Sequence, residues 1–304
     1  MIELLHLAGV LLALGAAVAI AVTNLLIRKG TPGGGAYDAV LIVITVEVLV
    51  LTIPILWLYY PDYGLTRTSW LVFIAAGLTG TVTGQIFHFM SIDRIGASRT
   101  APIVASWALL STILGVLLLG EDVSVIHAVG VVLVVGGVAA IAWETSQGTP
   151  GGLSKREVLI GLALPFVAAA AYGLEPIFAK IGFAEGTPAP VGLVVKTIAA
   201  LVGFTCYLWW RHQLPDPGVL RTPSGRWYVL AGITTTIFLV GYYTALEIAP
   251  VSIVAPIIVT NTLFVVILAA LFMPRQLERV TWPLAIAATV VVVGVVIITV
   301  ASPG

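Results

Sequence analysis

Long runs of apolar residues alternate with short polar breaks along the whole chain. A helix needs about 20 predominantly apolar residues to cross a hydrocarbon core about 30 Å thick, and the runs reach this length. The runs are continuous rather than alternating in polarity, which disfavours barrel strands. We therefore expect an all-α membrane protein with ten transmembrane helices, at 7–27, 38–60, 69–90, 97–119, 124–143, 158–179, 190–210, 228–247, 250–273 and 281–301.

Composition narrows the class of protein further. Of the 304 residues, 60% are apolar and 9% are charged, and the mean hydropathy is +1.11. Soluble domains carry about 25% charged residues, so a soluble enzyme is excluded, and the net charge of zero disfavours a nucleic-acid partner. The single cysteine, Cys206, permits no intrachain disulfide and no cysteine metal site. We expect a multi-pass protein of the plasma membrane whose first apolar run is retained rather than cleaved as a signal peptide.

A repeated motif divides the chain into two halves. The segment from Asp93 to Ile103 aligns with the segment from Glu247 to Ile257 at a constant offset of 154, matching an acidic residue, a serine and an Ala-Pro-Ile triplet. A second alignment, at an offset of 152, pairs Gly9, Arg28 and Gly30 with Gly161, Lys180 and Gly182. We expect two five-helix repeats, at 1-146 and 155-304.

The distribution of basic residues indicates that the repeats are inverted. Five spans per half is an odd number, so the second half enters the membrane in the opposite orientation. Basic residues concentrate in the first and third connections of the first half, but in the second and fourth connections of the second half. Eleven basic residues then lie on one face and two on the other, which by the positive-inside rule predicts both termini outside.

The repeated junctions resemble the EamA family of the drug/metabolite transporter superfamily. The resemblance rests on the ten inverted spans, on Gly96-Ala97-Ser98 before Ala101-Pro102, and on Gly120-Glu121 closing the fourth span. It implies a permease that moves small solutes by alternating access through a central cavity between the halves. Two points depart from the family pattern. Pro274-Arg275 replaces a second Gly-Glu pair, and family members have cytoplasmic termini, so the absolute orientation stays open.

Two ionisable residues lie within corresponding spans of the two repeats, Glu47 in the second and Lys196 in the seventh. Such groups cost about 2.5–3.5 kcal/mol at the membrane centre and are functional candidates. One interpretation places both in the cavity, where they bind the ammonium and carboxylate groups of an amino-acid-like solute. The alternatives are a mutual or local ion pair, or a lysine that reaches the interface.

Two further titratable residues are candidates for ion coupling, Glu175 and His88. Pro176 frees the carbonyl of Tyr172 and is expected to break the helix beside Glu175, where a carboxylate could carry a proton or accept a cation. Glu175 could equally be solvated near the interface. His88 could titrate near neutral pH, or serve as an interfacial polar residue.

Matched prolines mark the fourth and ninth spans. Pro102 and Pro256 free the carbonyls of Ser98 and Ser252, and paired kinked helices point to a substrate site, unless both prolines only start their helices. The remaining substrate-binding candidates are polar or aromatic residues of spans three, four, eight and nine: Gln85, Ser106, Trp107, Tyr242, Tyr243 and Asn261. Trp107 could stack on a solute or fill packing space.

The leading interpretation is a secondary-active transporter of small metabolites such as amino acids, with export favoured over uptake. The expected partners are a small-molecule solute and membrane lipid; no nucleic acid, cofactor or metal is expected, and the choice between monomer and homo-oligomer is open. The sequence has no P-loop and no catalytic constellation, so we expect no enzyme. The alternatives are an integral-membrane enzyme acting on a lipid-linked substrate and a non-transporting scaffold subunit.

Overall fold

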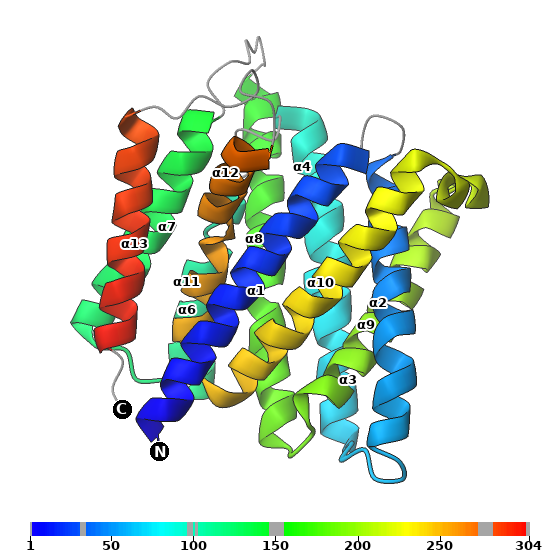
Figure 1. Cartoon of the computed structure of the whole chain (residues 1–304), viewed down its shortest axis with the longest axis horizontal. Helices are drawn as coiled ribbons and strands as arrows, with labels where there is room; N and C mark the ends of the chain where they lie inside the picture. Colours follow the sequence, from blue (N-terminus) through cyan, green and yellow to red (C-terminus); the bar gives the residue numbers. More distant parts are fainter. Residues whose placement is uncertain are drawn as a thin grey trace.

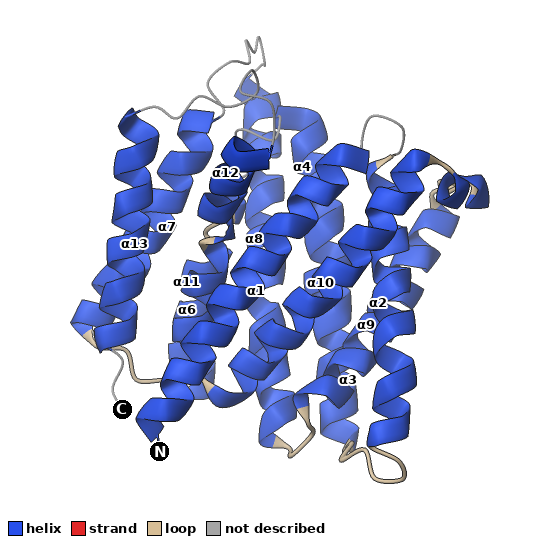
Figure 2. Cartoon of the chain, viewed as in Figure 1, coloured by secondary structure: helices blue, strands red, loops and turns tan. Residues whose placement is uncertain are grey.

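The computed structural model describes residues 2–30, 35–95, 100, 103–145, 155–272 and 282–301. Within these ranges every regular element is a helix, and the helices form one elongated bundle (Figure 1, Figure 2). The first half contains α1 (Ile2–Gly30), α2 (Ala36–Leu58), α3 (Arg67–Ala76), η2 (Gly77–Gly84), α4 (Gln85–Ile95), α6 (Trp107–Leu119) and α7 (Val125–Thr145). The second contains α8 (Lys155–Ala184), α9 (Ala189–Trp210), η3 (Pro217–Arg221), α10 (Pro223–Ile248), α11 (Val251–Val259), α12 (Asn261–Phe272) and α13 (Trp282–Ala301).

Among the described residues, seven stretches are long and apolar enough to cross a membrane: Leu7–Gly30, Ala36–Leu58, Arg67–Ile92, Ala163–Ala184, Ala189–Trp210, Pro223–Ile248 and Val251–Leu268. Three shorter apolar helices, Trp107–Leu119, Val125–Ile141 and Ile286–Ile298, lie where the sequence predicts the fourth, fifth and tenth spans. The helical, multi-pass architecture is therefore confirmed, and the count of ten spans stays a prediction.

Helix ends follow from local sequence. Thr66 caps α3 by accepting a hydrogen bond from the Ser69 N–H, and Thr222 caps α10 in the same way, with a proline directly after it. Gly120 ends α6 in the left-handed region, at φ +67°, where glycine is favoured. These caps keep the connections short and set the helices against their neighbours.

The first helices of the two halves run in opposite directions. In Figure 1, α1 leads away from the end of the bundle where α1 begins and α13 ends, here called the terminal face, whereas α8 leads toward it. The halves also interlock: α1 packs along α10, α8 packs along α3, η2 and α4, and α7 packs along α13. This arrangement agrees with inverted repeats that share one core.

The fourth and ninth spans are interrupted at matched residues, Ser106 and Thr260, which lie 154 positions apart. At each break the side-chain hydroxyl donates to the carbonyl three residues earlier, Ile103 or Ile257, at 2.6 Å. A new helix starts at the next residue in both cases. Thus the described ninth span is interrupted four residues after Pro256, which itself lies inside α11. Pro102 lies outside the described residues.

The prediction that Pro176 breaks its helix is wrong, because α8 continues from Lys155 to Ala184 through both Pro165 and Pro176. Neighbouring helices support a proline-containing helix in a membrane, and α8 is packed against α3, η2, α4 and α6. The irregular backbone lies instead in η2, which packs against α8. η2 is a π-helical segment between α3 and α4, a feature that often accompanies functional sites.

Candidate functional site

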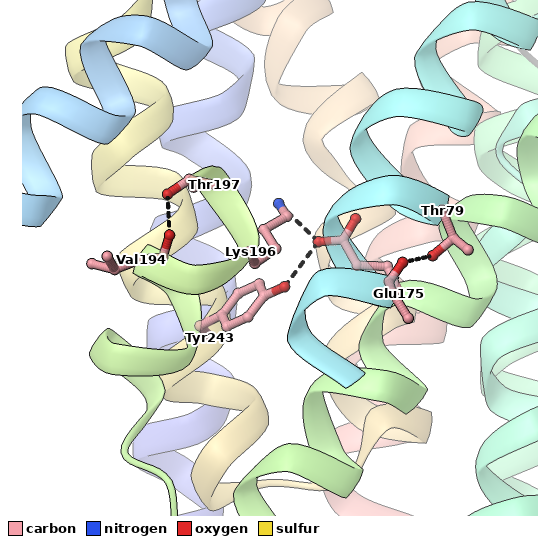
Figure 3. Close-up of polar contacts among 7 residues, drawn as sticks. Thr79, Glu175, Val194, Lys196, Thr197 and Tyr243 are labelled. Atoms are coloured by element: carbon pink, nitrogen blue, oxygen red, sulfur yellow. Dashed lines mark hydrogen bonds and ion pairs between the residues drawn. The ribbon is translucent and has the colours of Figure 1, made fainter. Parts of the chain in front are cut away.

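Buried ionisable side chains lie on three neighbouring helices: Glu47 on α2, Glu175 on α8 and Lys196 on α9, which are 4%, 8% and 3% exposed. The Lys196 Nζ lies 3.0 Å from the Glu175 Oε1 (Figure 3). Tyr243 of α10 donates its hydroxyl to the same oxygen at 3.2 Å. The Lys196 Nζ also lies 5.6 Å from the centre of the Tyr243 ring, within cation–π range. We call these four residues the charged cluster.

Glu47 makes no hydrogen bond or ion pair within the described part of the chain, although it interacts electrostatically with both Lys196 and Glu175. The charged cluster therefore holds two carboxyl groups and one ammonium group. Burying a charge without a partner is costly in a low-dielectric interior. The arrangement favours binding of one further positive charge, a proton or a cationic group, beside Glu47.

Glycines of η2 let the η2 backbone pack closely against α8 and α9, which carry Glu175 and Lys196. A Cβ added at Gly80 would overlap the Glu175 carboxylate, and one added at Gly77 would overlap the Lys196 carbonyl oxygen. A Cβ at Gly84 would lie 2.6 Å from the Tyr172 ring. At Gly77 the obstacle is the backbone of α9, so glycine is required there. At Gly80 and Gly84 a Cβ would force the Glu175 and Tyr172 side chains to shift.

The threonines that flank the cluster in Figure 3 use their hydroxyls within their own helices. Thr79 donates to the Ala75 carbonyl at 2.7 Å, and Thr197 donates to the Val194 carbonyl at 3.1 Å. Neither hydroxyl therefore donates to the charged cluster.

Tyr242 and Tyr243 were both candidates, and the structure gives them different contacts. Tyr243 reaches Glu175, whereas Tyr242 stacks on Phe238 with ring centres 5.5 Å apart and an interplanar angle of 8°. The two tyrosine rings meet edge to face at 5.7 Å. Tyr242 therefore supports the position of the Tyr243 ring.

Gln85 and His88 lie on α4, directly after η2. The Oε1 atom of Gln85 is buried without a hydrogen-bond partner among the described residues. The His88 ring stacks on Phe89 and meets Tyr172 edge to face, with ring centres 6.2 Å apart in each pair. Neither side chain has a described hydrogen bond or ion pair to the charged cluster.

Ser106, Trp107 and Asn261 lie at the two helix breaks. Asn261 donates its side-chain amide to the Ile258 carbonyl at 2.9 Å, and the Ser106 hydroxyl is used at its own break. Trp107 is partly buried and packs against the main apolar core. These residues shape the breaks and have no described hydrogen bond to the charged cluster.

The mutual Glu47–Lys196 ion pair considered from the sequence is not formed, since Lys196 pairs with Glu175. Glu175 is buried, so the solvated alternative is also excluded. A signal for this pair exists in the sequence. Glu175 lies nine residues before α8 ends and Lys196 lies seven after α9 begins, so a short turn between antiparallel helices places them at similar depth.

The fold and the buried charged cluster define a polytopic membrane protein with an ionisable site in its interior, the class to which solute carriers belong. Residues 7–143 and 159–300 each match the model of the EamA-like transporter family. The chain therefore belongs to the EamA-like transporter family, with two repeats of it in tandem.

Comparison with solved structures supports the fold. One structure, titled "Crystal structure of protein", is 18% identical to this chain and has a TM-score of 0.76, with 95% of this chain and 96% of that chain covered. At this identity the likeness shows the fold alone. No curated protein matches the chain.

Proposed function

We propose that this protein is a secondary-active transporter that exports small zwitterionic solutes, such as amino acids or related metabolites, across the plasma membrane. The observation that carries the proposal is the unpaired carboxyl group of Glu47 beside the Glu175–Lys196 ion pair. Family membership supports a transporter of small solutes. Elements of both halves contribute, α2 from the first and α8, α9 and α10 from the second, so relative movement of the repeats changes the site.

The solute ammonium group binds Glu47 and supplies the missing positive charge. The solute carboxylate binds Lys196, whose flexible side chain turns away from Glu175 to meet it. Tyr243 remains beside both groups and limits where Lys196 moves. A zwitterion is thus recognised at both ends without adding net charge to the membrane interior.

The change of partner at Lys196 also couples solute binding to proton binding. When the solute carboxylate takes Lys196, Glu175 loses its counter-charge and binds a proton instead, because an isolated carboxylate is costly there. Release of the solute returns Lys196 to Glu175 and expels the proton. Solute and proton thus bind and leave together through one shared lysine, so they cross in the same direction, and export is driven by the solute's own outward gradient.

The test is flux of radiolabelled amino acids and amines in proteoliposomes, with and without a pH gradient. Glu47→Gln keeps the shape and removes the charge, so we expect transport of ammonium-bearing solutes to fall about ten- to a hundredfold. Asp122→Asn, in an exposed connection, is the matched control. Normal flux in Glu47→Gln would remove Glu47 from the mechanism. Absence of flux for every solute would contradict transport, and chemical turnover without flux would favour an enzyme.

A further inference from the structure

A carboxylate from the first half caps a helix of the second half. α11 begins after Pro250, which has no side chain able to cap it. Glu121, from the connection between α6 and α7, accepts the Val251 N–H on Oε1 at 2.6 Å and the Ser252 N–H on Oε2 at 2.9 Å. Two charge-assisted hydrogen bonds at the positive end of a helix dipole make a strong contact between the halves.

The chain is shaped to aim Glu121 at this point. Gly120 turns the backbone out of α6, and the Glu121 N–H donates to the Gly115 carbonyl at 3.2 Å. A Cβ added at Gly115 would lie 2.9 Å from the Glu121 Oε2, so glycine makes room for the carboxylate. The Glu121 backbone is thus held by its own half, and the side chain extends from there to α11.

Other groups hold the same α10–α11 turn. The Lys180 Nζ of α8 donates to the carbonyls of Leu246 at 2.9 Å and Ala249 at 3.3 Å. The Nε2 of His127 on α7 lies 3.0 Å from the Ser252 oxygen, the carbonyl that Pro256 leaves without an intrahelical donor. Polar groups from α6–α7, α7 and α8 thus converge on one turn at the terminal face (Figure 1).

The repeat counterpart of this contact differs in sequence. The offset of 154 that matches the two junctions places Arg275 at the position of Glu121. An arginine side chain has no acceptor atom and carries the wrong charge for a helix N-terminus, so it cannot form this cap. Residue 275 lies outside the described residues, and the comparison is one of chemistry alone. Residue 121 therefore offers a carboxylate where its counterpart, residue 275, offers a cation.

We propose that Glu121 is a latch that holds the α10–α11 turn against the α6–α7 connection, so that the terminal face opens only when the carboxylate leaves α11. The inference rests on the proposed transport function, because a latch matters in a protein whose two ends open in turn. Because the counterpart position carries an arginine, we expect the two openings to differ in free energy. The asymmetry sets the resting state of the transporter.

The latch is tested by the reactivity of a cysteine placed beneath it. In a Cys206→Ser background, which removes the native cysteine, Ser252→Cys introduces a nearly isosteric thiol at a position 1% exposed. The rate of reaction with a membrane-impermeant maleimide is measured in nanodiscs, where both ends are accessible. We expect the rate to rise about ten- to a hundredfold in Glu121→Ala, with a smaller rise in Glu121→Gln, which keeps one acceptor.

Asp122→Asn, the adjacent exposed acidic residue, is the control and leaves the rate unchanged. Gel filtration and thermal unfolding identify variants that remain folded, and Glu121→Gln serves if Glu121→Ala does not fold. Equal labelling rates in the folded Glu121 variants and in the parent would overturn the latch. The readout needs no solute: faster labelling without flux would keep the latch and reject transport, whereas flux with unchanged labelling would do the reverse.

Discussion

Two repeat-related sites in the interior share a position and differ in chemistry. Glu175 on α8 corresponds to Thr23 on α1 at the offset of 152, and Gly80 on η2 corresponds to Thr234 on α10 at the offset of 154. At the first of these sites the Glu175 carboxylate of the second half lies over Gly80 of the first half. At the counterpart site the Thr23 and Thr234 hydroxyl oxygens are 2.7 Å apart, and Thr235 donates to Thr23 at 3.3 Å. We call these three residues the threonine cluster.

The comparison shows how a symmetric scaffold holds an asymmetric site. Hydroxyl groups satisfy one another and the helix backbone, as Thr23 does with the Ala19 carbonyl at 3.1 Å, so nothing further is needed. A carboxylate needs a counter-charge, which Lys196 brings from α9. The corresponding stretch of α2, residues 42–44, is entirely apolar and supplies none. Charge is therefore confined to one of the two related sites.

The largest expected effect comes from removing the counter-charge. Lys196→Met leaves two buried carboxyl groups without a counter-charge, and we expect unfolding free energy to fall by about 3–5 kcal/mol, with loss of flux. Thermal unfolding in detergent and proteoliposome flux measure the two effects. The double variant Lys196→Met with Glu175→Gln should recover much of the stability and none of the flux. A single variant as stable as the parent would show that the ion pair is not needed.

An intermediate effect is expected from adding a side chain at Gly80, whose counterpart at the other site is Thr234. Gly80→Ala places a methyl group against the Glu175 carboxylate, so overpacking should cost about 1–3 kcal/mol and reduce flux. Gly136→Ala is the matched control, because a Cβ there meets no atom within 4 Å. We expect that variant to remain within about 0.5 kcal/mol of the parent. Equal behaviour of the two variants would contradict close packing of η2 on α8.

The smallest effect is expected in the threonine cluster. Thr23→Val keeps the shape and removes the hydroxyl, so stability should fall by about 0.5–1.5 kcal/mol with flux retained. Thermal unfolding and flux are measured as for Lys196→Met. Loss of flux comparable to that of Lys196→Met would mean that both related sites take part in transport, and the comparison would fail.

The repeat could be predicted from sequence because it appears in linear order. The Ala-Pro-Ile triplets at residues 101–103 and 255–257 predicted matched junctions, and the breaks at Ser106 and Thr260 keep the same offset. Breaks four residues after each proline position were not predicted. They depend on side-chain hydroxyls that donate to carbonyls of the preceding turn and so compete with the helical hydrogen bonds. A hydropathy pattern does not show this competition.

The four residues of the charged cluster were each site candidates from the sequence, but their grouping and pairing were not predicted. Glu47, Glu175 and Lys196 stand out because ionisable residues are rare in apolar spans. Which carboxylate meets Lys196 depends on how α8, α9 and α2 rotate about their axes, and the glycines of η2 decide this by admitting α8 closely. Glu121 was noted only as part of a motif, since its partners are backbone amides that any residue could present.

The sequence by itself determined a helical membrane protein. Unpaired backbone polar groups are costly in lipid, so a continuous apolar run that crosses the membrane forms a helix, which pairs those groups within itself. The sequence also determined the duplication and the small set of ionisable residues in the interior. Only the tertiary structure decided that Lys196 forms its ion pair with Glu175, that Glu47 is left unpaired, and that Glu121 accepts hydrogen bonds from α11. Those outcomes depend on distances of a few ångströms between segments far apart in the chain, and Coulomb and hydrogen-bond energies vary steeply over that range.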